Sequence, residues 1–430
     1  MSAQSTATPT IEAPAASPND EAIEVRITGL DPGAHVTLEA TLVDDEDEVW
    51  SSRATFVADE TGTVALGDQA PADGDWDVAA PMGWCWAMTG DGDAATATLG
   101  KRPAVEVTFR ALAADGRETT RTVTRQVYDG ALRARSVAGA SDLDTDPDTD
   151  PGPDTDLVGT LYLPAGDGPH PAVVSLHGSA GRLGPDRTEK VLATRGYATL
   201  ALDYTGPAEA LPDRIREVSL GYVRRAIDWL RNRPAVADGP VGLFGVSRGA
   251  ELALLVGARN DGVGAVVSYA GSGVAFDTPM GDPAWVDDGE PVPHVSGTGE
   301  PDRTDDGEVV TRPVLERGFD EADPARRAAA TIPVEEIDGP VLLVSGGDDR
   351  VWPARKLSAV AAERLAAADH DFAHLTRDDV GHLIGVPHGP LASFDRGGGS
   401  PRATARLGEA AWKQTLDTFE RGLGSSARRD

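Results

Sequence analysis

The chain has 430 residues but a single cysteine, Cys85, so it can form neither an internal disulfide nor a metal site built from several thiolates. It also lacks any apolar run of the roughly 18 residues that a membrane-spanning helix needs. Its first residues do not show the basic and then apolar pattern of a secretory signal peptide. We therefore expect a cytoplasmic protein with no membrane span and no metal.

Lysine is almost absent, since four of the 39 basic residues are lysine, and 70 acidic residues bring the net charge to −31. An excess of Asp and Glu with arginine in place of lysine is typical of a salt-rich cytoplasm, where screening reduces self-repulsion. No basic stripe is available for nucleic acid. A polyanionic small molecule stays compatible with this charge, because in molar salt the Debye length falls to roughly 3 Å and only local arginines matter.

Three segments differ in pattern. Residues 1–22 are rich in Ala, Pro, Ser and Thr and predict a disordered tail. Residues 23–126 hold short alternating segments separated by Gly and Asp turns, which predict a β-sandwich. Residues 127–424 alternate apolar strands with amphipathic helices, which indicates the α/β class with a mostly parallel, doubly wound sheet.

The most informative motif is a Gly-x-Ser-x-Gly pattern centred on Ser247, between a strand-like and a helix-like run. That is the context of a nucleophile elbow. The turn there is so tight that the residues two before and two after the serine cannot carry a bulky Cβ, which Gly245 and Gly249 satisfy. A serine so placed stands at a helix N-terminus, where amide dipoles favour negative charge.

A serine hydroxyl is a weak nucleophile and needs a base that a carboxylate orients. An apolar run at residues 340–345 ends in a glycine pair, after which come Asp348, Asp349 and a helix opened by Pro353. Either acid could instead cap that helix. We expect Asp349 to be the catalytic acid, because the Gly-x-x-Asp spacing from Gly346 recurs in this kind of fold.

The candidate base is His382, in a Gly-His turn one predicted strand after the acid. The order Ser247, Asp349, His382 is the one expected of an α/β-hydrolase. Its position favours His382 as the base. The competing histidines are His370, His374 and His388.

An oxyanion hole requires two backbone N–H groups. A small-residue loop follows an apolar strand at residues 171–176, and we expect Ser179 to supply one N–H and Arg248 the other. His177 is expected to brace this loop rather than to react. A plain strand-to-helix turn would have a similar sequence, so the donors are the least specific part of the prediction.

Two acidic inserts interrupt the hydrolase pattern. Residues 142–156 alternate carboxylates but lack the glycine and glutamate spacing of an EF-hand, so a solvated loop is the better interpretation. Residues 281–324 are rich in Gly, Pro and Asp and lie between the elbow helix and the acid strand. Insertions at that place often cover the substrate, which makes this segment a candidate lid.

The chain resembles the family of acyl-CoA thioesterases that also contains bile acid-CoA:amino acid N-acyltransferase. The resemblance covers nearly everything after the tail. Its most specific elements are a Pro-Met-Gly-x-x-Trp segment and the elbow with its trailing Gly-Ala-Glu. The motifs that carry it are Thr61–Val64, Ala70–Pro71, Pro81–Trp86, Leu202–Tyr204 with Leu211–Pro212, Gly242–Glu251, Ile332–Glu335, Gly347–Asp349 with Trp352, and Pro401–Arg402 with Ala411–Lys413.

This resemblance implies an immunoglobulin-like domain before an α/β-hydrolase domain, and a triad of Ser247, Asp349 and His382. The N-acyltransferase branch typically has cysteine at the elbow, so Ser247 resembles the hydrolytic members. The implied function is hydrolysis of acyl-CoA to a free acid and coenzyme A. Coenzyme A is then part of the substrate, and no cofactor is expected.

Three alternatives remain open. An esterase or dienelactone-hydrolase-like enzyme would keep the triad but prefer small oxygen esters, and an acyl-CoA:amino acid N-acyltransferase would pass the acyl group to an amine. A binding protein with a degenerate hydrolase domain fits less well, because every triad position is filled. The sequence leaves the oligomeric state and the acyl chain length open.

Overall fold

The computed structural model describes residues 8–92, 94, 96–137, 157–182, 184–304, 307–391 and 397–424. The chain forms two compact units. The first comprises Met1–Gly130, Val386–Phe394 and Ser400–Glu409, and the second comprises Ala131–Gly385, Asp395–Gly399 and Ala410–Asp430. The acidic loop predicted at 142–156 lies outside the described residues.

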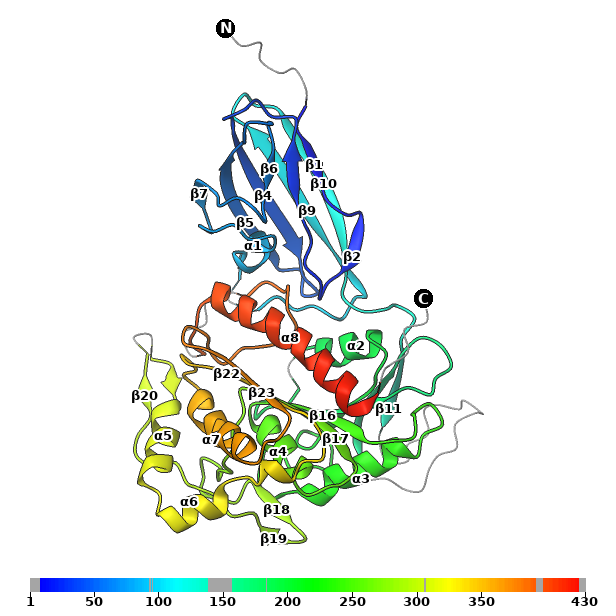
Figure 1. Cartoon of the computed structure of the whole chain (residues 1–430), viewed down its shortest axis with the longest axis vertical. Helices are drawn as coiled ribbons and strands as arrows, with labels where there is room; N and C mark the ends of the chain where they lie inside the picture. Colours follow the sequence, from blue (N-terminus) through cyan, green and yellow to red (C-terminus); the bar gives the residue numbers. More distant parts are fainter. Residues whose placement is uncertain are drawn as a thin grey trace. The chain divides into compact units, whose positions relative to one another are not determined.

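The first unit is a β-sandwich whose two sheets have the strand orders β1-β3-β6 and β2-β10-β9-β4-β5-β7, with β8 pairing with β5 (Figure 1). Side chains alternate between buried and exposed along β4 and β5, so each strand gives one face to the core. The elements are β1 (Thr10–Glu12), β2 (Ala16–Pro18), β3 (Arg26–Thr28), β4 (His35–Val43), β5 (Val49–Val57), β6 (Val64–Ala65), β7 (Asp73–Gly74), α1 (Gly83–Trp86), β8 (Thr89–Gly90), β9 (Ala104–Ala113) and β10 (Glu118–Gln126).

The prediction of a disordered tail through residue 22 is wrong for the part that the structure describes. Strand β1 pairs with β3, and β2 pairs in parallel with β10. Arg125 explains the second pairing, because its buried guanidinium donates to the Ser17 hydroxyl over 2.6 Å and to the carbonyl of Glu21 over 2.6 Å. Composition alone misses this, since the segment is ordered by a partner more than 100 residues away in the sequence.

A second difference concerns residues 386–394 and 400–409, which the sequence pattern assigned to the hydrolase domain. Those of them that the structure describes belong to the first unit. The described part of this segment adds a bridge between Thr96 and Leu391 and a hydrogen bond from the Ala97 amide to the carbonyl of Pro390, 3.1 Å long. Local pattern does not reveal such a return of the chain.

The second unit is an α/β-hydrolase domain around a sheet of order β11-β12-β14-β13-β16-β17-β22-β23. Strand β12 is antiparallel to both of its neighbours, and from β14 to β23 all pairings are parallel. The predicted fold class is thereby confirmed. The strands are β11 (Arg133–Val137), β12 (Val158–Leu163), β13 (Ala172–Leu176), β14 (Ala198–Asp203), β16 (Val241–Val246), β17 (Val263–Tyr269), β22 (Val341–Gly346) and β23 (Phe372–Arg377).

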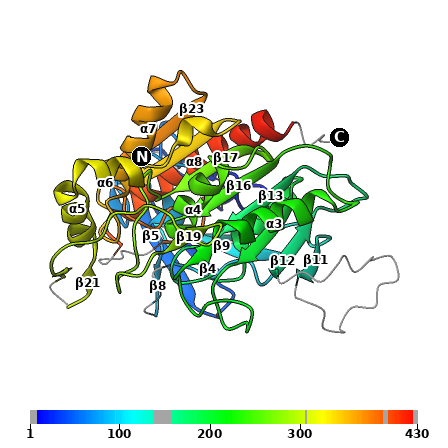
Figure 2. The same ribbon diagram turned by 90° about the horizontal axis from the view of Figure 1, so that it is seen from below.

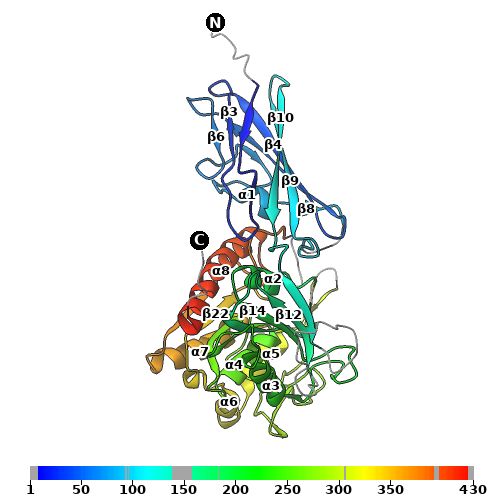
Figure 3. The same ribbon diagram turned by 90° about the vertical axis from the view of Figure 1, so that its right-hand side faces the viewer.

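Helices cover both faces of this sheet. Helix α2 and the part of α8 from Ala410 onward lie on one face, and α3, α4 and α7 lie on the other (Figures 2 and 3). The ring of Phe419 packs so closely on Gly242 that a Cβ there would lie 2.8 Å from it. The helices are α2 (Arg187–Thr194), α3 (Leu220–Arg231), α4 (Arg248–Gly257), α5 (Arg312–Glu321), α6 (Pro324–Ala330), the 3₁₀ turn η1 (Val334–Glu336), α7 (Ala354–Ala367) and α8 (Pro401–Leu423).

The insert between β17 and β22 is built from short elements rather than from an irregular loop. Its strands β18 and β19 form one small sheet together with β15, which comes from the segment before α3, and β20 pairs with β21 in another, before helices α5 and α6. The predicted lid segment 281–324 falls within it, and its covering role stays a prediction. The remaining strands are β15 (Val218–Ser219), β18 (Trp285–Asp287), β19 (Glu290–Pro291), β20 (Asp302–Arg303) and β21 (Val309–Val310).

Parallel pairing fixes where the functional residues gather, because the carboxyl ends of parallel strands meet at one edge of the sheet. Strands β13, β16, β22 and β23 are followed there by the segments that hold Gly178, Ser247, Asp349 and His382. Within the described ranges, none of the helices combines the length and the apolar character that crossing a membrane requires.

Candidate active site

Ser247 stands in the turn between β16 and α4 with a backbone φ of 56° and ψ of −120°. A non-glycine residue with positive φ is strained and persists only where its surroundings fix it. Here the Ser247 amide donates to the carbonyl of Tyr269 over 2.8 Å, and the strand before the turn is buried. The strained turn is therefore held from both sides.

The two elbow glycines are required sterically. A Cβ on Gly245 would lie 2.4 Å from the carbonyl oxygen of Gly249, and a Cβ on Gly249 would lie 2.2 Å from that of Leu176. Real Cβ atoms do not approach backbone oxygens so closely. Strand β13, the turn and the first turn of α4 thus pack at backbone contact, as the spacing of the motif predicts.

Asp349 and His382 are brought together. His382 Nδ1 lies 2.7 Å from Asp349 Oδ2, so Nδ1 carries the ring proton and donates a hydrogen bond to the carboxylate. The other oxygen, Oδ1, accepts from the amides of Val351 and Trp352 over 3.0 and 2.9 Å. Asp349 is fully buried. The geometry leaves Nε2 of His382 as the acceptor of the ring.

The neighbouring acid does something else. Asp348 Oδ2 accepts from the Gly399 amide over 2.8 Å, and its side chain is 43% exposed. The His382 amide donates to the carbonyl of Gly397 over 2.9 Å, so the acid and histidine turns pack on the same short segment. Of the two neighbouring acids, Asp349 therefore contacts the His382 ring and Asp348 bonds to Gly399, and Asp349 is the acid that the glycine spacing favours.

The competing histidines have other partners. His370 Nε2 lies 2.7 Å from the carbonyl of Ile337. His374 Nε2 lies 2.8 Å from the hydroxyl of Ser345, and burial lowers the pKa of His374. His388 belongs to the first unit. Of the four histidines considered, His382 has the contact with the acid.

The predicted oxyanion loop lies beside the serine. A Cβ on Gly178 would be 3.3 Å from the Ser247 Cβ and 3.8 Å from its Oγ. The next residue is the exposed Ser179, and Arg248 is the first residue of α4, where the N–H groups have no intrahelical acceptor. Both predicted donors therefore come from segments next to Ser247.

His177 braces the loop in the way that the sequence suggests. Its ring stacks on Tyr204 with 4.1 Å between centroids, its Nδ1 donates to the carbonyl of Gly178 over 2.8 Å, and the Tyr204 hydroxyl donates to the carbonyl of His177. Burial lowers the pKa of His177, which favours the neutral ring. It bonds to the loop backbone and holds the course of residues 177–178.

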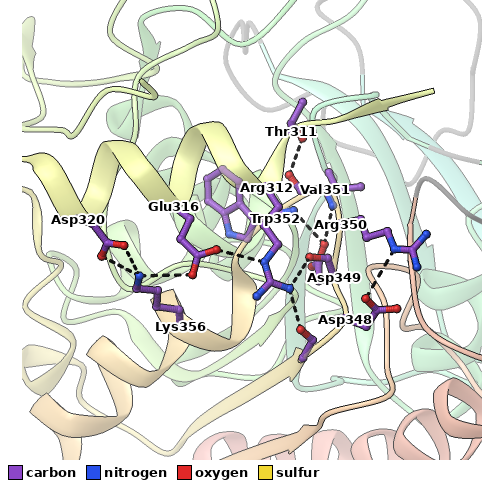
Figure 4. A network of polar contacts seen from close by, with 11 residues as sticks. Thr311, Arg312, Glu316, Asp320, Asp348, Asp349, Arg350, Val351, Trp352 and Lys356 are labelled. Carbon is purple, nitrogen blue, oxygen red and sulfur yellow. Dashed lines mark hydrogen bonds and ion pairs between the residues drawn. The ribbon is translucent and has the colours of Figure 1, made fainter. Parts of the chain in front are cut away.

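Helix α5 of the insert holds the acid turn, a contact that sequence reasoning missed (Figure 4). Arg312 Nη1 donates to the carbonyls of Gly347 and Asp349 over 2.7 and 3.2 Å. The Thr311 hydroxyl donates to the carbonyl of Val351 over 2.6 Å. The insert is thus bonded to the backbone on both sides of the Asp349 side chain.

Arg312 is part of a chain of charges along α5 and α7 (Figure 4). Its Nε lies 3.4 Å from Glu316 Oε2. Glu316 and Asp320 both form ion pairs with Lys356 of α7. These side chains are about one-third to one-half exposed. Salt screens such pairs, so we attribute the positioning effect to the two backbone contacts of Arg312 rather than to the ion pairs.

Sequence reasoning also missed a buried ion pair directly behind the nucleophile. Arg248 Nη1 lies 3.2 Å from Glu251 Oε2, and the Glu251 side chain is fully buried. Burial raises the pKa of Glu251, and the charge of Arg248 opposes that rise. The i, i+3 spacing of a cation and an acid in an otherwise apolar helix is the signal that could have found it.

Two family models match the chain. The one described as Acyl-CoA thioester hydrolase/BAAT N-terminal region matches residues 20–138, and the one described as BAAT / Acyl-CoA thioester hydrolase C terminal matches residues 218–425. The chain belongs to this family. The resemblance that the elbow and the Pro-Met-Gly-x-x-Trp segment indicate is therefore confirmed.

Similar proteins cover nearly the whole chain. The peroxisomal succinyl-coenzyme A thioesterase of Mus musculus is 28% identical over 430 residues, which is 95% of each chain. Acyl-coenzyme A thioesterase 1 of Homo sapiens is 29% identical over 423 residues, 94% of each chain. Among solved structures, acylaminoacyl peptidase from Pyrococcus horikoshii is 12% identical with a TM-score of 0.44, covering 96% of this chain and 61% of that one.

Proposed function

We propose that this protein is an acyl-CoA thioesterase that uses Ser247, His382 and Asp349 as a catalytic triad. The observation that carries the proposal is the hydrogen bond between His382 Nδ1 and Asp349 Oδ2, 2.7 Å long, at the same edge of the sheet as a strained serine elbow. Membership of the family adds the substrate class, because the relatives reported above carry the names of acyl-CoA thioesterases.

Acylation begins with proton transfer from Ser247 Oγ to Nε2 of His382, the ring nitrogen that the contact with Asp349 leaves as an acceptor. Oγ attacks the thioester carbonyl as the proton leaves. Asp349 keeps the ring in the required tautomer and stabilises the imidazolium that forms. Because the amides of Val351 and Trp352 also bind this carboxylate, its direction is fixed before the substrate arrives.

The tetrahedral intermediate carries negative charge on the former carbonyl oxygen. The Arg248 N–H at the start of α4 and the Ser179 N–H of the neighbouring loop are the proposed donors to it. The intermediate collapses with loss of the coenzyme A thiolate, a weak base that needs little acid assistance. The proton on Nε2 of His382 passes to the departing thiolate, so that the ring can act as a base again. An acyl-serine ester remains on Ser247.

Deacylation repeats the cycle with water. His382 takes a proton from the water molecule, the hydroxide attacks the ester carbonyl, and the proton returns to Ser247 Oγ as the free acid leaves. The proposed reaction uses no metal and no cofactor, since coenzyme A is part of the substrate. Hydrolysis rather than transfer to an amine is favoured because the nucleophile is serine, whose ester suits attack by activated water.

We also propose a salt-rich cytoplasm as the setting of the activity, on the strength of the net charge of −31 and the near absence of lysine. Concentrated KCl is therefore the appropriate assay medium. At low ionic strength, self-repulsion among the acidic side chains is expected to lower stability and with it the activity.

The test is the release of free thiol from a panel of acyl-CoA thioesters in concentrated KCl. Release by the parent chain and its loss in Ser247→Ala would support the proposal and give the chain-length preference. Ser51→Ala makes the same chemical change at an exposed site on β5 and should keep full activity. No release by the parent chain would overturn the proposal.

Two further measurements separate the related functions. Turnover of nitrophenyl esters without any release from acyl-CoA would indicate an esterase. Formation of acyl-glycine at the expense of free acid when glycine is added would indicate an acyltransferase. The family description names both acyl-CoA thioester hydrolases and BAAT, the bile acid-CoA:amino acid N-acyltransferase. The experiment with glycine should therefore accompany the measurement of thiol release.

A further inference from the structure

The side chain of Arg248 points into the protein and not into the solvent. It is 7% exposed, and Nη1 lies 3.2 Å from Oε2 of the fully buried Glu251. Both residues belong to the first turn of α4, immediately after Ser247. A buried ion pair is a weak source of stability, because desolvation offsets most of the attraction, and its known uses are in fixing one arrangement of the chain.

The pair binds both the carbonyl and the amide of one residue, Phe276. Arg248 Nη2 donates to the carbonyl of Phe276 over 2.8 Å, and Glu251 Oε1 accepts from the amide of Phe276 over 3.1 Å. The same Oε1 accepts from the indole Nε1 of Trp285 on β18 over 2.5 Å. The first turn of α4 is thereby bonded to the chain that leads into the insert.

The guanidinium also lies between two indole rings. Its central carbon is 5.2 Å from the ring centre of Trp285 and 5.4 Å from that of Trp352, distances at which a cation is attracted to an aromatic face. The amide of Trp352 donates to Asp349 Oδ1 over 2.9 Å. One buried cation therefore contacts both the insert and the residue that binds the catalytic acid.

The backbone of Arg248 links this cluster to the chemistry. Its N–H is a proposed oxyanion donor, and such a donor acts only when it is aimed where the negative charge develops. The backbone of Ser247 is strained, so its conformation persists only if the next residue, Arg248, is held in place. The contacts of the Arg248 side chain fix that neighbour and at the same time the turn that holds Asp349.

We propose that Arg248 and Glu251 are positioning residues. Through the side chains of Trp285 and Trp352 they fix the position of the Arg248 N–H relative to the turn that holds Asp349. Neither side chain touches the substrate. The proposal rests on Ser247 acting as a serine nucleophile but not on acyl-CoA being the substrate. A nitrophenyl ester can therefore test it even if the thioesterase proposal fails.

The experiment compares Arg248→Gln and Glu251→Gln with the parent chain. A fluorophosphonate titrates the active sites, so that kcat refers to folded enzyme alone. The affinity for an alkyl trifluoromethyl ketone, which forms an oxyanion on the serine, is measured in parallel. We expect kcat and ketone affinity to fall together by about 10- to 100-fold, less than the 10²- to 10³-fold cost of removing an oxyanion donor, with KM within about threefold.

Two other variants keep the test decisive if a glutamine variant does not fold. Arg248→Lys retains the charge and should recover part of kcat. Trp285→Phe keeps a ring over the guanidinium but removes the bond to Glu251, and should show a smaller fall in both quantities. The matched control is Arg259→Gln, because Arg259 pairs with Asp287 of the same strand β18 away from the elbow, and its kcat should match the parent's.

The contradictory result is equally specific. If Arg248→Gln and Glu251→Gln lose stability but keep the parent's kcat per titrated site and its ketone affinity, the pair is structural and the proposal is wrong. A fall in kcat that leaves the ketone affinity unchanged would also overturn it, because the oxyanion donor would then be in place.

Discussion

Among the residues that the structure describes, each unit buries one arginine deeply, and the two are used differently. Arg125 of the β-sandwich donates from Nη1 and Nη2 to neutral oxygens, the Ser17 hydroxyl and the carbonyls of Asn19 and Glu21. Arg248 of the hydrolase unit faces a carboxylate, a carbonyl and two indole rings. Burial lowers the pKa of Arg125, and the charges of Asp20 and Glu21 oppose that fall.

The difference lies in what each cation connects. Arg125 ties a strand end to the sandwich, so its loss should affect folding only. Arg248 joins the turns that hold Ser247 and Asp349, the proposed nucleophile and acid, so its loss should affect the rate per folded molecule. Both side chains are buried and hydrogen-bonded, so burial alone does not separate a structural from a functional charge, and the identity of the connected segments does.

The largest effect is expected in the hydrolase unit, at Asp349→Asn. An amide there can donate to Nδ1 of His382 and so favours the wrong tautomer, and we expect kcat to fall by about 10³- to 10⁴-fold. The control is Asp348→Asn, one residue away and bonded to Gly399, which should stay within about threefold of the parent. Steady-state kinetics with active-site titration would decide. Equal losses in both variants would make the assignment of the acid wrong.

Arg125→Met tests the other side of the comparison. It leaves two backbone carbonyls without their donor, and we expect the free energy of unfolding to drop by about 3 kcal/mol while kcat per titrated site is unchanged. Chemical denaturation measures the first quantity. Arg110→Met on the neighbouring strand β9 removes an exposed arginine and should leave the unfolding midpoint close to the parent's. A change in kcat for Arg125→Met would break the comparison.

A smaller effect is expected at Arg312, which holds the acid turn from the insert. Arg312→Gln removes the bonds to the carbonyls of Gly347 and Asp349, and we expect kcat to fall about tenfold, equivalent to about 1.4 kcal/mol. Arg317→Gln on the same helix is the control, because Arg317 bonds to carbonyls within the insert. Equal rates in the two variants would show that α5 does not position the acid.

The smallest effect concerns another acid, Glu189, which is partly buried and whose direct partner is the Ser175 hydroxyl at 2.6 Å. Burial, with the charge of Asp186, raises the pKa of Glu189 in the folded state. The folded state therefore keeps this proton over a pH range in which the unfolded state has lost it, so stability falls as the pH rises above the ordinary glutamate value.

Glu189→Gln keeps an acceptor for Ser175 and removes that loss. Unfolding free energies measured from acid to neutral pH should decline less steeply with pH in the variant than in the parent chain. Parallel curves would mean that Glu189 binds its proton equally in both states. Glu251 is fully buried and has an arginine in contact, whereas Glu189 is partly buried and bonds to a hydroxyl, so the two acids extend the comparison to carboxylates with different partners.

Much of the hydrolase unit could be predicted because its signals are local. The alternation of strands and helices gives the parallel sheet. Gly245 is required by its contact with Gly249, four residues further on, and the contact of Gly249 with Leu176 follows from the pairing of β13 with β16. The order of Ser247, Asp349 and His382 places all three at one edge of the sheet. Short-range sterics and strand order suffice for these features.

What could not be predicted depends on partners distant in the sequence. Residues 10–18 have an ordered structure because of the contacts of Arg125 and because β10 offers an open edge for pairing. The return of residues 386–394 to the first unit rests on contacts such as that between Thr96 and Leu391. The role of the insert in bracing Asp349 needs the side chain of Arg312 to reach a turn 35 residues away. Composition carries no signal for any of these.

The central claim, a covalent route through Ser247, is tested most directly by trapping the acyl-enzyme. The parent chain is mixed with an acyl-CoA in concentrated KCl, quenched in acid within the first turnover, and analysed by intact and peptide mass spectrometry. The account predicts a burst of free thiol equal to the titrated sites and an added acyl mass on the peptide that holds Ser247, both absent from Ser247→Ala. Thiol release with no acyl group on that peptide, or an acyl group on another residue, would contradict it.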